Sequence, residues 1–408
     1  MKVVLPDDLV ERGDSKIVFL IMDGLGGLPH PETGLTELET AQTPNLDRLA
    51  QRSALGLIEP VLPGITPGSG PGHLALFGYD PVRWNIGRGV LSALGVGFDL
   101  RPGDVAARLN FATVDAEGRV TDRRAGRPSD EENRRLVAKL RERVKAPPGV
   151  ELFFESEKEH RAVMVLRGEG LSAELADTDP QATGVPPLHV RPLAEAGEEG
   201  DVERTARLVQ GILDDAREAL RDEPKANAVL ARGFAAYERY PSMADRYKLR
   251  SLAIARYPMY RGLARLVGMD TLPIPATDEA SVDALAEHFG EYDFYFVHFK
   301  ATDSTGEDGN FEAKVKAIEA VDRLVERVVE LKPDVLVVTG DHSTPSALRS
   351  HSWHPVPVLI ASRWARPQPG VTGFGERECR KGELGVFPAV HLMTLALAHA
   401  GRLAKFGA

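Results

Sequence analysis

The 408-residue chain contains a single cysteine, Cys379, so no disulfide bond can form within it. That scarcity indicates a reducing compartment, and we expect a cytoplasmic protein. No apolar stretch approaches the roughly 18 residues of a membrane-spanning helix, and residues 1–14 lack the long apolar core of a signal peptide. The formal net charge of −10 disfavours nucleic acid and anionic membranes as partners. A small anionic substrate remains compatible with this charge, because arginines or metal ions can reverse the field within one cleft.

Short apolar runs alternate with amphipathic segments along most of the chain. The runs are predicted to be buried strands of a parallel sheet: residues 16–22, 251–257, 292–299, 334–340 and 356–362. Helices are predicted between and after them: residues 43–53, which open on Thr43-Pro44, 311–331 and 388–401. Such alternation predicts an α/β fold with a mostly parallel sheet.

The middle of the chain has a different character. From about residue 101 to residue 222 the charge density rises, and the strongest helical patterns cover 129–144 and 201–220. The apolar runs in this part are short and alternate more, as half-exposed antiparallel strands do: residues 108–114, 151–156 and 160–168. We therefore predict a smaller α+β domain, 101–222, inserted into a core domain made of 1–100 and 223–408. Residues 193–201 are predicted to form a mobile acidic loop.

Carboxylates and histidines follow or precede several of the predicted strands. In open α/β sheets, ligands bind beyond the carboxyl ends of the strands. The side chains that the pattern brings to this edge are Asp23, Asp303 with Glu307, Asp341 with His342, and His351 with His354. Taken alone, each segment is explained by a turn or a satisfied polar group, and residues 300–310 have the composition of a turn. Together the segments predict one shared site.

The types of side chain point to a metal site. Carboxylate oxygens and imidazole suit Mn²⁺, Mg²⁺ or Zn²⁺, and the candidates are too many for one ion and about enough for two. Paired ions can hold the attacking and leaving oxygens of a phosphoryl transfer. Ser69 is the candidate nucleophile, because it lies in a Gly/Pro-rich turn just before a predicted helix at 73–79. The alternative for Ser69 is a capping residue in a flexible loop.

These motifs resemble the alkaline phosphatase superfamily, and more closely its cofactor-independent phosphoglycerate mutases, especially the shorter archaeal-type branch. The stretches that carry the resemblance lie between residues 16 and 360 and include FLIMDGLGG, TPGSGPGHLALFGYDP, DRRAGR, TGDHSTP and HSWHPVPVLI. The resemblance implies a mostly parallel sheet with helices on both faces and an inserted domain that encloses the substrate.

The resemblance also implies roles for individual residues. Ser69 resembles the nucleophile that becomes phosphoserine. The ligands of one metal ion would be Asp23, Ser69, Asp341 and His342, and those of the other would be Asp303, Glu307 and His351. His351 matches the family pattern better than His354. The family usually has histidine where this chain has Glu307, and the added carboxylate shifts the preference towards Mn²⁺ or Mg²⁺. We expect two divalent ions, Mn²⁺ first, with Mg²⁺, Co²⁺ or Zn²⁺ as alternatives.

The activity implied is the interconversion of 3-phosphoglycerate and 2-phosphoglycerate without 2,3-bisphosphoglycerate. A substrate with a phosphate and a carboxylate calls for cationic and hydrogen-bonding side chains. The candidates are His73, Asn110, Arg124, Arg127, Arg161, Arg261 and Lys300. For the arginines the alternative is a solvated basic face, and for His73 it is a cap of the turn. Two rival functions stay open: a phosphohydrolase or small-metabolite phosphotransferase on the same scaffold, and a binding protein that has lost a metal. The sequence leaves the oligomeric state open.

Overall fold

The computed structural model describes residues 5, 7–84, 86–193 and 199–407. The chain divides into two compact units, a core unit (Met1–Asn85 with Pro241–Ala408) and an inserted unit (Ile86–Tyr240). The insertion is therefore wider than the predicted 101–222. Its limits differ because helix α4 (Arg88–Gly95) packs on strand β3 (Val105–Val114), and strand β7 (Ala228–Ala236) pairs with β3.

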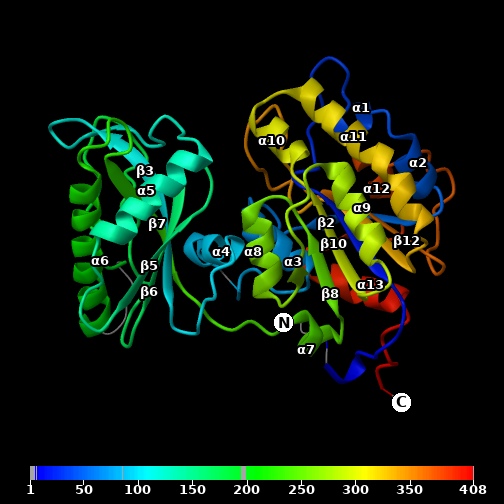
Figure 1. Ribbon diagram of the computed structural model, residues 1–408. Coiled ribbons are helices and arrows are strands. Elements are labelled where there is room, and N and C mark those ends of the chain that lie inside the picture. The colour runs from blue at the N-terminus through cyan, green and yellow to red at the C-terminus, as the bar shows by residue number, and fades with distance from the viewer. Residues whose placement is uncertain (1–4, 6, 85, 194–198, 408) are drawn as a thin grey trace. The chain divides into compact units, whose positions relative to one another are not determined.

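An eight-stranded sheet forms the centre of the core unit (Figure 1). In spatial order its strands are β13 (Gly385–Pro388), β2 (Ala54–Glu59), β12 (Val356–Ser362), β11 (Val335–Thr339), β1 (Ile17–Met22), β10 (Phe294–Phe299), β8 (Ser251–Ile254) and β9 (Asp270–Thr271). Strand β1 pairs in parallel with both β10 and β11, whereas β12 is antiparallel to β11 and β2. The prediction of a mostly parallel α/β sheet is confirmed, but the prediction that 356–362 is a parallel strand is wrong, because β12 is antiparallel to both of its neighbours.

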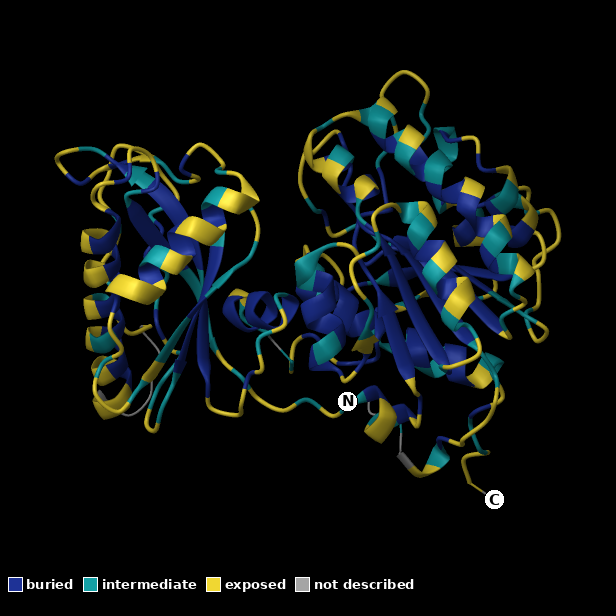
Figure 2. Cartoon of the chain, viewed as in Figure 1, coloured by how far each residue is buried: buried dark blue, intermediate teal, exposed yellow. Residues whose placement is uncertain are grey.

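Helices lie on both faces of this sheet (Figure 1). On one face α11 (Phe311–Glu330) contacts α1 (Glu37–Thr40), α2 (Pro44–Ala50) and α9 (Asp278–His288). On the same face α12 (Glu376–Lys381) packs on β2. On the other face lie α3 (Ser69–Leu76), α8 (Pro258–Leu266) and α13 (Leu392–His399). Cover on both faces explains why every residue of β1, β10 and β11 is buried (Figure 2). The remaining short elements are α7 (Met243–Tyr247), α10 (Ala301–Glu307) and the 3₁₀ turns Asp7–Leu9 and Ala389–His391.

The predicted core helices are found with small shifts. Helix α2 begins at Pro44 and ends at Ala50, three residues before the predicted limit, and α11 ends one residue before its predicted limit. The last predicted helix is a 3₁₀ turn followed by α13, and Gly401 follows it with φ of +67°, as a helix-ending glycine does. Strand β8 stops at Ile254 rather than residue 257, because Pro258 starts α8. Within the described residues, no helix has both the length and the hydropathy to cross a membrane.

The inserted unit is an antiparallel sheet with two long helices packed on it. Its strands are β3, β4 (Val120–Asp122), β5 (Glu151–Ser156), β6 (Arg161–Arg167) and β7, and its helices besides α4 are α5 (Asp130–Arg143) and α6 (Glu199–Leu220). Both helices bury an apolar stripe, with Leu136 and Val209 fully buried, and expose the opposite face (Figure 2). The α+β character predicted for this part is therefore present. Residues 194–198 of the predicted acidic loop lie outside the described residues, and α6 starts at Glu199.

A half-buried carboxylate ties α12 to the loop after β1. Glu376 accepts hydrogen bonds from Gly27 N at 3.0 Å and from Thr36 Oγ1 at 2.6 Å. Burial raises the pKa of Glu376 to about 7. The folded chain therefore holds a proton near pH 6 that the unfolded chain has already released.

This difference predicts a pH-dependent stability. Because the folded-state pKa of Glu376 is raised, its contribution to the free energy of unfolding is greatest below pH 5 and is lost as pH rises through 7. Between pH 5 and pH 8 the free energy of unfolding of the metal-free wild type should fall by roughly 2 kcal/mol more than that of Glu376→Gln. Urea denaturation at several pH values measures this, and parallel profiles for the two proteins would contradict it.

Candidate metal centre

Three aspartates converge at the edge of the sheet where the parallel strands end. Asp23 directly follows β1, Asp341 follows β11, and Asp303 lies in α10 just after β10. Because β1 lies between β10 and β11 in the sheet, the three strand ends are neighbours. All three carboxylates are fully buried. The structure thus brings together the acids that the sequence predicts to share a site.

The segment after β10 is a helix and not the turn that its composition suggests. Helix α10 covers Ala301–Glu307, so Asp303 and Glu307 lie one helical turn apart on the same face. Gly306 lets α10 approach the loop after β11: a Cβ at this position would lie 2.3 Å from Thr344 O. Tertiary packing thus prevails over the turn preference of Asp, Gly and Asn.

The first cluster consists of Asp23, Asp341 and His342, whose ligand atoms lie within 4.8 Å of one another. His342 Nε2 is 3.3 Å from Asp23 Oδ1 and 3.2 Å from Asp341 Oδ2. Ser69 Oγ joins the cluster at 3.3 Å from His342 Nε2. The side chains expected to share one metal ion are therefore adjacent.

The second cluster is Asp303, His342 and His351, which meet the same 4.8 Å limit. His351 Nε2 is 3.5 Å from Asp303 Oδ1, and the imidazole rings of His342 and His351 stack with centroids 3.7 Å apart. Glu307 lies at the margin: its Oε1 is 3.7 Å from His351 Nε2, but its side chain is 54% exposed. His354 pairs instead with Ser352 Oγ at 3.0 Å.

The electrostatics of the two clusters fit divalent cations. Asp23 Oδ1 and Asp341 Oδ2 are buried and accept no well-directed hydrogen bond, which is costly for a carboxylate oxygen. Burial raises the pKa of Asp23, but Lys300 and His298 lower it further, so that it lies well below the ordinary value. Burial and the neighbouring Asp23 raise the pKa of Asp341 to about 6. Hard carboxylate oxygens beside imidazole nitrogens suit Mn²⁺, Mg²⁺ or Zn²⁺.

Ser69 is the first residue of α3, with Gly68 as N-cap, and not part of a turn before a later helix. Its hydroxyl therefore lies at a helix N-terminus, where backbone amides favour an anion. One turn on, His73 Nδ1 lies 2.9 Å from Ser69 O and 3.0 Å from Asp341 Oδ2, and its side chain is fully buried. The structure thus places His73 against Asp341, whereas the sequence suggested a phosphate contact or a cap of the turn.

Lys300 places a cation between two of the acids. Its Nζ lies 3.1 Å from Asp23 Oδ2, donates to Asp303 Oδ2, and donates to Tyr260 OH at 3.0 Å. Burial lowers the pKa of Lys300, but Asp23 and Asp303 raise it more, and the ammonium stays charged. This cation offsets part of the negative charge of the buried aspartates.

The sequence does not predict two side chains of the centre, His298 and Tyr260. His298, in β10, lies 3.2 Å from Asp23 Oδ2 through its Nε2, and the ring of Tyr260 stacks on it at 3.8 Å. Burial lowers the pKa of His298 to about 4, so its imidazole is neutral. An imidazole inside an otherwise apolar strand, one residue before the strand's end, was the signal that could have found it.

The remaining substrate-binding candidates divide between the units. The inserted unit holds Asn110, Arg124, Arg127 and Arg161. Burial, and then Arg161, Arg124 and Arg127, lower the pKa of His160 to about 4, which shows that positive charge concentrates around this histidine. Arg261 belongs to the core unit, where it is 7% exposed and donates to Ala255 O at 3.5 Å. Among the described residues it forms no ion pair with a carboxylate.

The turn that carries Arg124 and Arg127 is strained. Ala125, Gly126 and Arg127 all have positive φ, at 47°, 70° and 53°. Asp122 fixes this backbone by accepting from Arg124 N at 2.8 Å and from Gly126 N at 2.6 Å. Such a backbone conformation persists only where the surrounding contacts over-determine it.

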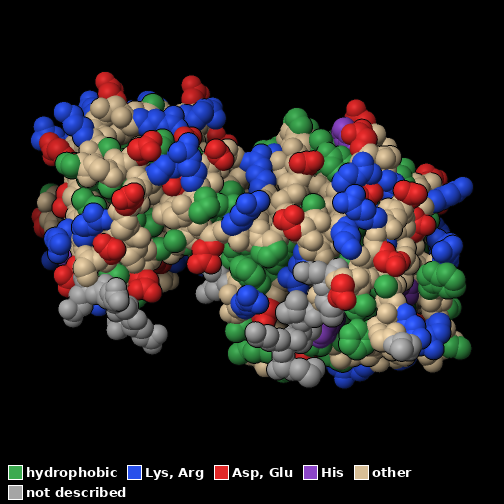
Figure 3. Space-filling view, turned by 90° about the horizontal axis from the view of Figure 1, so that it is seen from below, with side chains coloured by type: hydrophobic (Ala, Val, Ile, Leu, Met, Phe, Trp, Pro, Cys, Tyr) green, Lys and Arg blue, Asp and Glu red, His purple; other side chains and the backbone are tan. Residues whose placement is uncertain are grey.

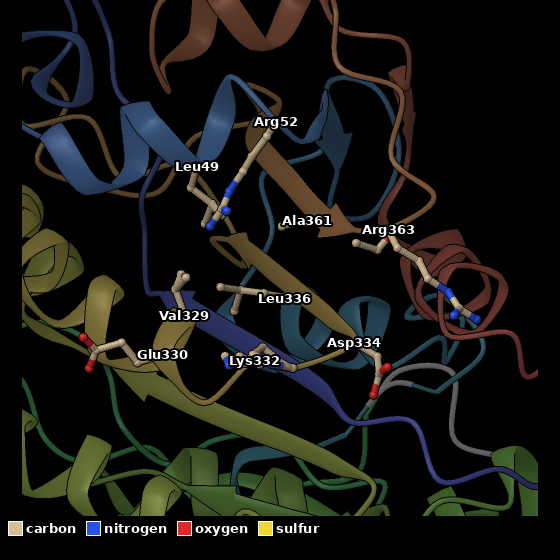
Figure 4. Close-up of a pocket in the computed structure, with 11 residues that line it drawn as sticks. Leu49, Arg52, Val329, Glu330, Lys332, Asp334, Leu336, Ala361 and Arg363 are labelled. Atoms are coloured by element: carbon tan, nitrogen blue, oxygen red, sulfur yellow. The ribbon is translucent and has the colours of Figure 1, made fainter.

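A cavity of about 600 Å³ lies elsewhere in the core unit (Figure 4). It is lined by Leu336 at the start of β11 and by Ala361 near the end of β12, so it opens at the sheet edge opposite Asp341. Apolar residues form much of its lining, and the described part of the chain offers no metal-ligand cluster there. Figure 3 shows one face of the molecule, on which basic and acidic side chains are interspersed, so the net negative charge is not gathered on that face.

Comparison with known proteins gives consistent results. A family model described as 2,3-bisphosphoglycerate-independent phosphoglycerate mutase matches residues 50–226. A Thermus thermophilus protein named probable 2,3-bisphosphoglycerate-independent phosphoglycerate mutase is 54% identical over 404 residues, which is 98% of each chain. A Thermotoga neapolitana protein of the same name is 52% identical over 401 residues, again 98% of each.

Two solved structures are similar over nearly the whole chain. A protein from Pyrococcus horikoshii has a TM-score of 0.82 at 31% identity and covers 97% of this chain and 100% of its own. The cofactor-independent phosphoglycerate mutase from Thermoplasma acidophilum has a TM-score of 0.71 at 29% identity, over 95% of this chain and 100% of its own.

The two clusters predict stabilisation by metal. Mn²⁺ at about 100 times its Kd should raise the free energy of unfolding by about 3 kcal/mol for each occupied cluster, relative to EDTA. Asp341→Asn, which keeps an acceptor for Gly24 N, should lose most of the gain that comes from the first cluster. Asp334→Asn is the matched control, because Asp334 is exposed and directly precedes the strand that Asp341 follows. Thermal denaturation with and without Mn²⁺ measures the effect, and an equal gain in Asp341→Asn would contradict the site.

Proposed function

Because the chain belongs to the family of 2,3-bisphosphoglycerate-independent phosphoglycerate mutases, we propose that it interconverts 3-phosphoglycerate and 2-phosphoglycerate through a phosphoserine at Ser69. Membership makes the chain an enzyme of this isomerase class and implies a small phosphate ester as its substrate. The observation that carries the proposal is the position of Ser69 Oγ, 3.3 Å from His342 Nε2, beside three buried aspartates.

Two divalent ions fit the residues of this centre. Asp23, Asp341 and His342, with Ser69, would hold one ion, and Asp303 and His351, with Glu307 at the margin, would hold the other. When bound, such ions supply Lewis-acid stabilisation of the charge on the transferring phosphoryl group. Burial lowers the pKa of His342 well below its ordinary value, so its imidazole is neutral and free to act as a ligand. Mn²⁺ as the physiological ion stays a prediction.

The chemistry proposed for the side chains is a pair of phosphoryl transfers. Ser69 Oγ loses its proton and attacks phosphorus while the bond from phosphorus to the glycerate oxygen breaks, and that oxygen takes up a proton. Glycerate then turns, its other hydroxyl loses a proton and attacks the phosphoserine, and Ser69 Oγ is released and reprotonated. Lys300 and the first amides of α3 stabilise the phosphate charge in both steps.

The arginines of the inserted unit suit the anionic groups of the substrate. Guanidinium groups bind carboxylate and phosphate through paired hydrogen bonds, and positive charge concentrates around His160. Exclusion of water matters for this reaction, since water that attacks phosphoserine would convert the mutase into a phosphatase. The enclosing role of the inserted unit stays a prediction, as does a cytoplasmic location.

A direct assay tests the proposed function. Purified protein, stripped of metal and refilled with Mn²⁺, should convert 3-phosphoglycerate to 2-phosphoglycerate without 2,3-bisphosphoglycerate and without releasing phosphate. Ser69→Ala should lower kcat by at least about a thousandfold, because the nucleophile is removed. Ser304→Ala, on the exposed side of α10, is the control and should keep the wild-type rate. Phosphate release without isomerisation would favour the phosphohydrolase.

A second test addresses Glu307. Glu307→His restores the residue that the family usually has at this position, and imidazole favours Zn²⁺ and Co²⁺ over Mn²⁺ more than a carboxylate does. The affinity for Zn²⁺ relative to Mn²⁺ should therefore rise by about tenfold. Competition titrations measure the ratio, with Glu312→His, an exposed acid of α11, as control. An unchanged ratio would show that Glu307 is not a ligand.

A further inference from the structure

Lys314 is a fully buried cation close to the metal centre, and the proposed mechanism gives it no part. It lies in the first turn of α11 and is 0% exposed. Lysine is rarely buried completely, and a cation near a helix N-terminus is opposed by the helix dipole. Both effects oppose this placement, so a specific interaction must offset their cost.

That interaction is a set of hydrogen bonds to three carbonyl groups. Lys314 Nζ donates to Gly24 O at 2.9 Å, to Gly26 O at 2.9 Å and to Thr344 O at 2.8 Å. A neutral amine has only two N–H groups, so three acceptors require the charged ammonium with its three donors. Burial lowers the pKa of Lys314 below its ordinary value, and Glu37 and Glu376 offset only part of this shift.

The three carbonyls belong to the two loops that carry metal-ligand candidates. Gly24 and Gly26 follow Asp23 at the end of β1, and Thr344 follows His342 after β11. Thr344 N also donates to Gly26 O at 3.0 Å and to Gly24 O at 3.3 Å. The loops thus meet around one buried ammonium, which sits where a monovalent cation would bind oxygen ligands.

The threonine extends this contact to both clusters. Thr344 Oγ1 donates to Asp303 Oδ1 at 2.7 Å, and it lies 2.9 Å from His342 Nδ1. Since its one proton goes to Asp303, the hydroxyl must accept from His342 Nδ1–H. This arrangement leaves the lone pair of His342 Nε2 facing Asp23, Asp341 and Ser69.

From these contacts we propose that Lys314 is a positioning residue: a tethered monovalent cation that fixes the loops after β1 and β11, so that the ligand atoms of both clusters converge. It acts through the backbone of Gly24, Gly26 and Thr344 and touches no metal ion itself. The inference rests on the metal-dependent function proposed above.

The first test measures Mn²⁺ binding rather than activity. In Lys314→Ala and Lys314→Met the Kd for Mn²⁺, followed through the electron paramagnetic resonance signal of free Mn²⁺, should rise by about 10- to 100-fold. Lys316→Ala is the matched control, since Lys316 is exposed on the same helix, and its Kd should equal that of the wild type.

Chemical rescue separates a cation from mere packing. Lys314→Ala leaves room for the missing chain, so propylammonium should restore Mn²⁺ affinity to within a few-fold of the wild type. Lys314→Met fills that room with an apolar chain and should not respond. Tetramethylammonium, which has no N–H donor, should rescue neither variant.

Each outcome decides between the alternatives. If wild type and both variants bind Mn²⁺ equally, Lys314 does not position the ligands and the inference is wrong, while the proposed function stands. If the wild type binds none of Mn²⁺, Mg²⁺, Co²⁺ and Zn²⁺, the metal-dependent function proposed above fails and the inference fails with it. If only Lys314→Ala fails to fold, the affinity of Lys314→Met decides. If neither variant folds, a purely structural role is sufficient and the inference is overturned.

Discussion

The core unit depends on one constraint: three carboxylates of like charge are held close together at one buried edge of its sheet. Asp23, Asp303 and Asp341 come from three adjacent parallel strand ends and have no exposed surface. Such proximity is unfavourable unless cations offset it. Lys300 bridges two of the acids from one side, and divalent ions suit the donor set that remains. The glycines and hydroxyls around the centre serve to bring the backbone close enough for this geometry.

The sequence predicts that these acids lie close together, because each of them comes just after a strand of the sheet. A run that is apolar throughout, such as β1, must be covered on both faces, and an acid just beyond such a run lies at the ligand-binding edge. Asp23 and Asp341 follow from that rule alone. The limits of the inserted unit do not, because they depend on the pairing of β3 with β7, more than a hundred residues later in the chain. Pairing over that distance leaves no local signal.

Other features escape prediction because their partners are distant. Residues 301–307 have the composition of a turn, yet they form α10 where Gly306 packs against Thr344 O. The amphipathic pattern of α11 identifies a helix but not the three carbonyls that surround Lys314. In each case a polar group is satisfied by backbone far away in the sequence. Local propensity and periodicity carry no information about such contacts.

The order of strands has a consequence for synthesis on the ribosome. Strand β1 is among the first segments made, but its neighbours β10 and β11 begin at Phe294 and Val335. During elongation the apolar β1 cannot pair with these neighbours until most of the chain has emerged. The inserted unit, by contrast, is complete once Tyr240 has emerged. Because domains fold as units and non-local pairing is slow, the inserted unit can form first, while the apolar core strands stay unpaired for longer.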